Sequence, residues 1–262
     1  MIPRQKLKLI RDELADTLYH ENLMNKPTYY SEITELIFNY PELPTILRNQ
    51  IIKKNDESFS LMIDIFEKNV DLSKKNKIAI FCSGSGLITE MLKEKFPAQI
   101  ELVHHYDYRE NMLNQNNYAD KKICIDLSKT INSDEKYDII ISMGNLRYFS
   151  DNLKVYSSNM DKLLTNNGKF FVSEVDKSLV HNFKRQFNKD SYTIDLKNKT
   201  CRCLRNTLFY FLLNRYKTDK QLRDLVLQCS TPDEDINTIL INLAGFIPFN
   251  CFYLIGEKLS TS

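Results

Sequence analysis

Residues Ile78–Gly86 read Ile-Ala-Ile-Phe-Cys-Ser-Gly-Ser-Gly, a short apolar run followed by a small, glycine-containing turn. Residues 78–81 are β-forming and apolar, which predicts a buried strand. The turn over residues 82–86 is followed by an amphipathic stretch, which predicts a helix over 87–95. A strand, a tight turn and a helix in succession are typical of proteins in which helices cover a parallel sheet.

The same alternation continues along the chain to residue 174. Further strands are predicted over 100–107, 122–125, 137–142 and 169–174, and further helices over 111–118 and 153–164. Short apolar strands that alternate with helices indicate a parallel sheet covered on both faces. Right-handed crossovers then give a doubly wound α/β sheet.

The flanking segments have a different texture. Residues 1–75 show helical spacing of apolar residues and predict three or four helices that form an N-terminal cover. We therefore divide the chain into 1–75 and 76–262, with residues 176–217 as an inserted lid. Within and after that insertion, the expected elements are a hairpin over 191–204, a helix or strand over 208–213, a helix from 231 to 245, and two short strands around 247–251 and 253–256.

Composition narrows the class of protein. The 262 residues are 42% hydrophobic and 27% charged, as in a soluble globular protein. The net charge of +2 argues against an electrostatically driven nucleic-acid binder. The six cysteines contain no CxxC pair and the four histidines no HExxH motif, so no metal site is expected. The N-terminus lacks the apolar core of a secretory signal, and no apolar run is long enough to span a membrane, so a cytoplasmic protein is expected.

Polar residues that follow the predicted strands are the candidates for a binding site. Glycine in the 83–86 turn allows close approach of a ligand to the backbone, although a turn of this composition is also common without one. Asp107 ends the second strand, where a carboxylate can accept hydrogen bonds from ribose hydroxyls or cap the next helix. Asp126 ends the third strand and can accept from an adenine amine or cap the turn that follows it. Residues 142–145 end the fourth strand at the same edge, followed by Arg147 and Tyr148.

These pieces together resemble class I S-adenosylmethionine-dependent methyltransferases. Residues 80–86 are similar to the family's D/E-x-G-x-G-x-G loop, residues 107–113 to its ribose-binding acid and the following helix, and residues 163–172 to its LLKPGG turn and fifth strand. The resemblance covers about residues 74–175, and more loosely the C-terminal end. It implies a Rossmann-like, seven-stranded, mostly parallel sheet, S-adenosylmethionine as cofactor, and methylation of a small molecule on nitrogen or oxygen. The residues it implies for cofactor binding are Cys82, Ser83, Gly84, Gly86, Asp107, Tyr108, Asp126, Leu127, Ser142 and Met143.

Two departures from the family pattern keep an alternative open. Ile80 stands where the family usually has an acid, and Cys82 replaces the first glycine. The alternative is a protein of the same fold that catalyses another reaction or serves as a binding subunit. A weaker alternative is an RNA methyltransferase. It requires a basic surface, which the balanced net charge does not indicate.

The acceptor side is less defined by the sequence. A general base is needed for a hydroxyl or a protonated amine, and weak candidates are His105, Tyr148 and Tyr30, with His20 and His104 behind them. Tyr19, Tyr29 and Tyr30 of the helical N-terminus are expected to cover a substrate pocket, with a dimer interface as the alternative. A homodimer is left open.

Overall fold

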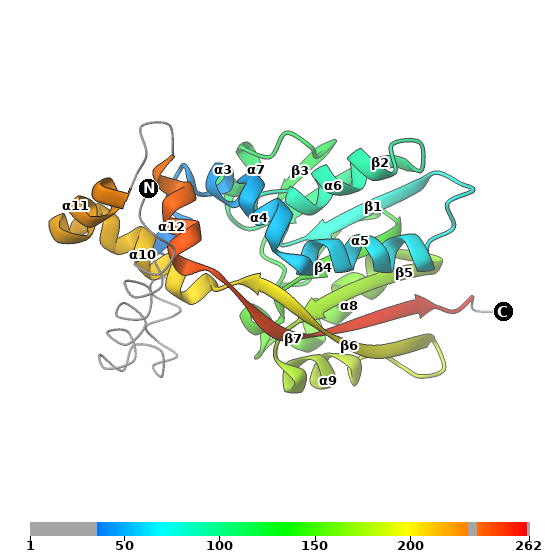
Figure 1. Cartoon of the computed structure of the whole chain (residues 1–262). Coiled ribbons are helices and arrows are strands. Elements are labelled where there is room, and N and C mark those ends of the chain that lie inside the picture. Colours follow the sequence, from blue (N-terminus) through cyan, green and yellow to red (C-terminus); the bar gives the residue numbers. More distant parts are fainter. Residues whose placement is uncertain (1–35, 230–234, 261–262) are drawn as a thin grey trace. The chain divides into compact units, whose positions relative to one another are not determined.

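The computed structural model describes residues 36–229 and 235–260 (Figure 1). The described residues form two compact units: residues 57–201 with 249–260, and residues 36–56 with 202–229 and 235–248. Tyr19, His20, Tyr29 and Tyr30 lie outside the described residues, so the predictions made for them stay predictions. Within the described part of the chain, no helix is both long and apolar enough to cross a membrane.

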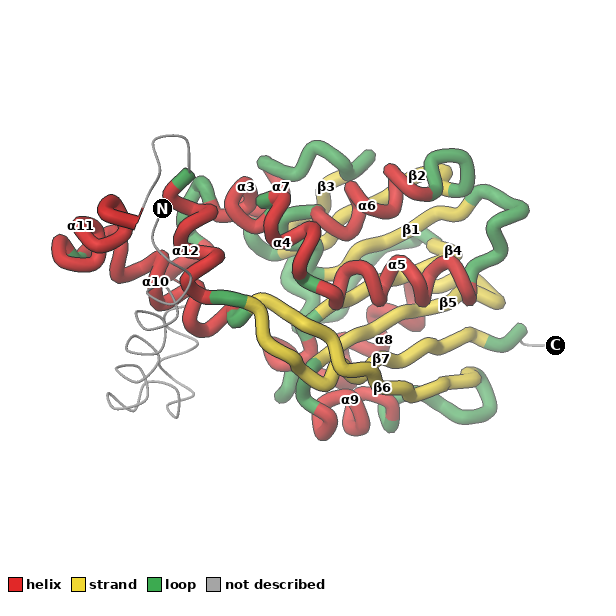
Figure 2. Tube along the Cα trace, in the orientation of Figure 1, coloured by secondary structure: helices red, strands yellow, loops and turns green. Residues whose placement is uncertain are grey.

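The first unit is built on a seven-stranded sheet with the order β3-β2-β1-β4-β5-β7-β6 (Figure 2). β3, β2, β1, β4 and β5 run parallel to one another, and β7 is antiparallel to β5. This mostly parallel sheet confirms the predicted fold class. The strands are β1 (Asn76–Phe81), β2 (Ile100–Asp107), β3 (Lys121–Cys124), β4 (Tyr137–Met143), β5 (Leu164–Glu174), β6 (Tyr192–Leu204) and β7 (Phe246–Lys258).

Helices cover both faces of the sheet (Figures 1 and 2). They are α5 (Glu57–Asn69), α6 (Leu87–Lys95), α7 (Glu110–Asn114), α8 (Leu153–Leu163) and α9 (Lys177–Lys184), with a short 3-10 helix, η2 (Leu146–Phe149). Consecutive residues of β5 pack against opposite faces of the sheet, because neighbouring side chains of a strand point to opposite sides. Phe170 stacks on Phe187 at 4.7 Å between ring centroids, and Phe171 meets Phe66 of α5 at 6.4 Å.

The predicted helix over 87–95 is confirmed residue for residue, and the strands over 100–107 and 137–142 agree to within one residue. Three expectations are wrong in detail. The predicted hairpin over 191–204 is a single strand, β6, and the two predicted C-terminal strands are one continuous strand, β7. The helix predicted over 111–118 ends at Asn114. β6 finds its hydrogen-bond partner in β7, and such long-range pairing leaves no local signal in the sequence.

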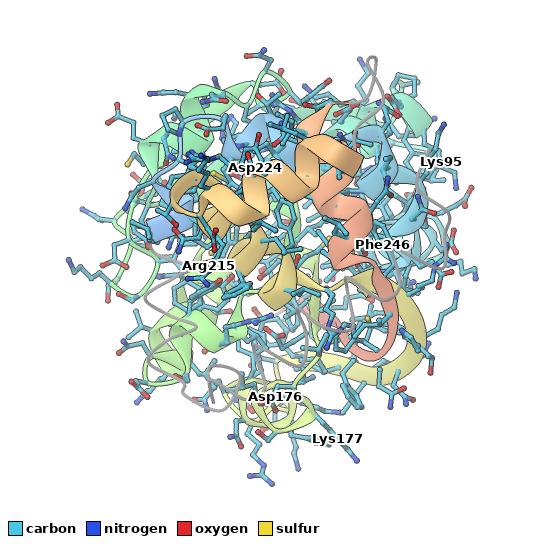
Figure 3. The ribbon with its side chains drawn as sticks, turned by 60° about the vertical axis from the view of Figure 1, so that its left-hand side comes forward. Lys95, Asp176, Lys177, Arg215, Asp224 and Phe246 are labelled. Carbon is cyan, nitrogen blue, oxygen red and sulfur yellow. The ribbon has the colours of Figure 1, made fainter. Side chains whose placement is uncertain are left out.

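The second unit is helical in its described part. It contains α3 (Leu43–Leu47), α4 (Gln50–Asn55), α10 (Asn206–Thr218), α11 (Lys220–Cys229) and α12 (Ile236–Ala244). Figure 3 shows Arg215 on α10 and Asp224 on α11.

Hydrogen bonds join the two distant stretches of chain within this helical unit. Tyr40 Oη donates to Asn214 Oδ1 at 3.0 Å, and Asn49 Nδ2 donates to Thr238 Oγ1 at 3.2 Å. In the structure α5 belongs to the sheet unit, and residues 176–217 contain α9, β6 and most of α10. The division at residue 75 and the lid over 176–217 stay predictions.

Candidate functional site

The turn after β1 is built from an unusual backbone. Cys82, Gly84 and Gly86 have φ values of 51°, 51° and 78°, in the left-handed region that favours glycine. Ser83 N donates to Tyr106 O at 3.3 Å, and Gly86 N donates to Ser83 O at 3.0 Å. The turn is therefore held between the end of β2 and the start of α6, and Gly86 is the residue that precedes that helix.

Asp107 is fixed beside this turn. Gly84 N donates to its Oδ2 and Arg109 N to its Oδ1, both at 3.1 Å. The residue is 4% exposed, and burial raises the pKa of its carboxyl although the two N–H groups act in the opposite direction. Each carboxylate oxygen still has capacity to accept another hydrogen bond. The structure thus places Asp107 next to the glycine turn, as the sequence leads one to expect.

A buried polar group lies beneath the turn. Ser142 Oγ and Tyr156 Oη are 2.8 Å apart. Cys82 is half-buried, and burial raises the pKa of its thiol well above the ordinary value. The Ser142–Tyr156 pair lies in the core, where the Tyr156 ring also packs against Phe81, the last residue before the turn.

Two of the other residues implied for the cofactor have local roles. Asp126 Oδ1 accepts from Ser128 N at 2.9 Å and from Ser128 Oγ at 2.6 Å, and these bonds are the main cause of its lowered pKa. This is the turn cap that the sequence left open as an alternative. The side chain of Leu127 is buried in the hydrophobic core.

Tyr108 and Met143 remain at the edge of the sheet. Tyr108 is 49% exposed and carries the Arg109 guanidinium over its ring, 4.1 Å from the centroid. Met143 is the last residue of β4 and is partly exposed. Both therefore present side-chain surface at the carboxyl ends of the strands, where ligands of such sheets bind.

The candidates for a general base that lie in the described part of the chain differ in burial. His105 is fully buried, with Nε2 2.6 Å from Thr89 Oγ1 and Nδ1 2.5 Å from Asn116 Nδ2. His104 Nδ1 lies 2.6 Å from Tyr137 Oη, within the protein. Tyr148, in η2, is 40% exposed and is the one of these three that presents its side chain to solvent.

We expect the His105 imidazole to stay neutral and not to titrate between about pH 5.5 and 8. Burial lowers its pKa to about 3, and both ring nitrogens are engaged. Nitrogen-detected NMR of the ring checks this. A His105 midpoint near 6.5 would contradict the placement. Below about pH 6.5 the His105 imidazole is protonated in the unfolded chain but stays neutral in the folded protein. The unfolded chain therefore binds more protons, so His105 lowers the folding stability as the pH falls.

Two asparagines shape the site: Asn145, from the candidate stretch 142–145, and Asn116, which the sequence did not single out. Asn116 is buried between His105 and the turn, and a Cβ added at Gly86 would lie 2.1 Å from its Nδ2. Asn145 Nδ2 donates to Phe81 O at 3.3 Å, which ties the end of β1 to the segment after β4. A buried asparagine in a short connection gives no pattern that sequence reasoning can use.

The described part of the chain also contains two buried side-chain atoms that lack a hydrogen-bond partner. They are Ser83 Oγ, in the turn after β1, and Glu174 Oε2, at the end of β5. Buried polar atoms are almost always paired in folded proteins. That both lie at the carboxyl ends of strands, at the same edge of the sheet, is the expected pattern for a site whose ligand supplies the missing partners. Among residues 36–229 and 235–260, no group of three or more His, Cys, Asp or Glu is arranged to hold a metal ion.

Comparison with known proteins agrees with this architecture. A family model described as a methyltransferase domain matches residues 81–172, which include the turn, Asp107 and the end of β4. The chain has the class I methyltransferase fold. The resemblance seen in the sequence is thereby confirmed.

Solved structures share this methyltransferase fold at low sequence identity. Coclaurine N-methyltransferase, bound to N-methylheliamine and SAH, aligns with a TM-score of 0.52 and 14% identity over 98% of this chain and 95% of its own. The YcgJ protein from Bacillus subtilis aligns with a TM-score of 0.51 and 12% identity over 78% of this chain and 99% of its own. No curated protein matches the sequence.

Proposed function

We propose that this protein is an S-adenosylmethionine-dependent methyltransferase that acts on a small molecule, on nitrogen or oxygen. One observation carries the proposal: the strained turn after β1 is bound through Gly84 to the buried Asp107 and leaves Ser83 Oγ without a partner. This arrangement lies inside the region that matches a methyltransferase domain.

The residues present fit a nucleoside cofactor. Asp107 keeps acceptor capacity for two ribose hydroxyls, and Ser83 Oγ has an unmet hydrogen bond at the same turn. The exposed ring of Tyr108 offers a flat apolar surface beside them. Positive φ at Gly84 and Gly86 brings the backbone close to any group seated at the turn.

When bound, S-adenosylmethionine supplies a methyl group already activated on a sulfonium. The task left to the chain is alignment: it holds the acceptor in line and keeps water away. Tyr148 stays our candidate for a proton acceptor, because its side chain is exposed at the carboxyl end of β4. The buried ring of His105 is not proposed for this role.

Two sequence features support a small acceptor. The segment after β4 reads Ser-Met-Gly-Asn over 142–145, which differs from the Asn-Pro-Pro-Tyr-type sequence of the common amino-methylases of nucleic-acid bases. The net charge of +2 is also low for a protein that tracks a phosphate backbone. The N-terminal segment with Tyr29 and Tyr30 remains our proposed cover for such an acceptor.

The departures at positions 80 and 82 support the alternative, a protein of this fold without methyl transfer. Position 80, where the family usually has a carboxylate, is occupied by an isoleucine whose side chain is buried. Cys82 has a φ of 51°, in the left-handed region that suits the glycine usual at this position of the family. The turn is therefore preserved in shape although its composition has changed, which favours retained cofactor binding.

S-adenosylhomocysteine at about 100 times its dissociation constant is expected to raise the melting temperature by roughly 5–10 °C, because a ligand at that level stabilises the folded state by about 2.7 kcal/mol. Differential scanning fluorimetry and calorimetry measure the shift and the affinity. Nicotinamide adenine dinucleotide, which shares the adenosine, serves as the control ligand and should shift the melting temperature less. Absence of both a shift and a heat of binding would exclude the cofactor, whereas binding without methyl transfer to any acceptor would favour the alternative.

A further inference from the structure

Glu174 is a buried carboxylate at the end of β5. The residue is 3% exposed, and its Oε1 accepts from Val175 N at 2.8 Å. Arg147 Nη2 lies 3.6 Å from the same oxygen, Oε1. The second oxygen, Oε2, is buried and has no hydrogen-bond partner.

An unpaired oxygen on a buried carboxylate is costly. A carboxylate only accepts hydrogen bonds, so it requires donors around both oxygens. Leaving a buried polar atom unsatisfied is unfavourable, and more so when the group is charged. The Arg147 guanidinium lies beside Oε1, so it gives no hydrogen bond to Oε2. The next acid along the chain, Asp176, caps α9. Figure 3 shows Asp176 beside Lys177 at the start of that helix.

The position of Glu174 connects it to the candidate site. β5 adjoins β4, which adjoins β1, and all three run parallel. Gly144 N donates to Ser173 O at 2.8 Å, so the end of β5 is tied to the segment after β4. With strands about 4.8 Å apart, the ends of β1 and β5 are about 10 Å apart. Glu174 is therefore at the same edge of the sheet as the turn that we assign to the cofactor, two strands away from it.

We propose that Glu174 Oε2 binds a protonated amine carried by the acceptor molecule. The inference rests on the proposed function and names the class of acceptor for that site. A cationic N–H donor satisfies the unpaired oxygen and offsets its charge, whereas a neutral hydroxyl provides only the hydrogen bond. Charge-assisted N–H to carboxylate bonds are also about twice as strong as neutral ones.

The test compares matched amines and alcohols on protein saturated with S-adenosylhomocysteine. Phenethylamine is paired with 2-phenylethanol, and n-butylamine with n-butanol, and binding is measured by calorimetry and thermal shift. We expect each amine to bind at least tenfold more tightly than its alcohol. In Glu174→Gln, which keeps the size of the side chain and removes its charge, we expect that preference to fall below about twofold, with affinity for S-adenosylhomocysteine unchanged.

Glu257→Gln is the matched control. Glu257 lies on β7 opposite Lys169, five residues before Glu174 in β5, and this variant should retain the preference for amines. Amines and alcohols that bind alike, or not at all, would overturn the inference and leave Oε2 to a water or a proton. A preference that survives in Glu174→Gln would overturn it as well. If the unmodified protein does not bind S-adenosylhomocysteine at all, the proposed function is rejected. The amines and alcohols are then compared on the protein without that ligand.

Discussion

Gly86→Ala is expected to lower the free energy of unfolding by roughly 2–5 kcal/mol and to abolish binding of S-adenosylhomocysteine. Two costs combine at this position. The φ of 78° is unfavourable for a residue with a Cβ, and the new methyl group would lie 2.1 Å from Asn116 Nδ2. Asn116 cannot move aside freely, because it is buried and bonded to His105. Chemical denaturation measures the stability, and calorimetry measures the affinity.

Gly144→Ala separates the two costs. Gly144 has a φ of 66°, and a Cβ added there meets no atom within 4 Å. This control should lose only the backbone term, about 1–2 kcal/mol. Equal destabilisation of the two variants would show that Asn116 gives way and that the tight packing against the turn is unimportant.

Asp107→Asn is expected to weaken binding of S-adenosylhomocysteine at least tenfold, the equivalent of about 1.4 kcal/mol or more. An amide has one acceptor oxygen, whereas Gly84 N and Arg109 N each donate to a separate oxygen of Asp107. In the variant, one of these N–H groups faces an NH₂ group, and the turn loses its anchor. The charge that would attract ribose hydroxyls is lost as well. Titration calorimetry gives the affinity.

Asp138→Asn is the matched control, because Asp138 Oδ2 accepts from Lys77 N at 2.9 Å near the start of β4, at the opposite edge of the sheet. Its affinity for the ligand should be unchanged. The pH dependence has a definite sign: affinity should fall as the pH falls through the raised pKa of Asp107, because the ionised form is the acceptor. Folding stability from this group changes the other way, since a raised folded pKa favours the native state at low pH. Unaltered affinity in folded Asp107→Asn would remove Asp107 from the site.

The fold was predictable where local and global preferences agree. Residues 78–95 carry a strand, a glycine turn and an amphipathic helix in direct succession, and the structure follows this pattern with a strand that begins two residues earlier, at Asn76. β6 and β7 were not predictable in the same way, because each depends on the other, 54 residues apart at their first residues, Tyr192 and Phe246. Such pairing is decided by tertiary contacts rather than by propensity.

The candidate site also contains residues that were predictable from the sequence and residues that were not. The 83–86 turn and Asp107 were predictable, because each directly follows a strand at the same edge of a parallel sheet. The roles of Asp126 and Leu127 depend on whether a side chain turns inward or bonds its own backbone, and a sequence leaves both open. Glu174 ends a predicted strand and was visible as an acid there. Its unpaired oxygen became apparent only once the surrounding hydrogen bonds were known.

The consecutive phenylalanines of β5 have a consequence for how the sheet unit unfolds. Phe170 belongs to the aromatic cluster under α9, and Phe171 contacts Phe66 of α5 on the other face. Two layers that are separated by the sheet are thus joined through adjacent peptide units of one central strand. If the packing on one face of β5 is lost, the strand is no longer held in place for the packing on the other face. The two layers therefore cannot unfold independently. The sheet unit should therefore lose both layers in one cooperative transition, with β5 among the last amides to exchange with solvent.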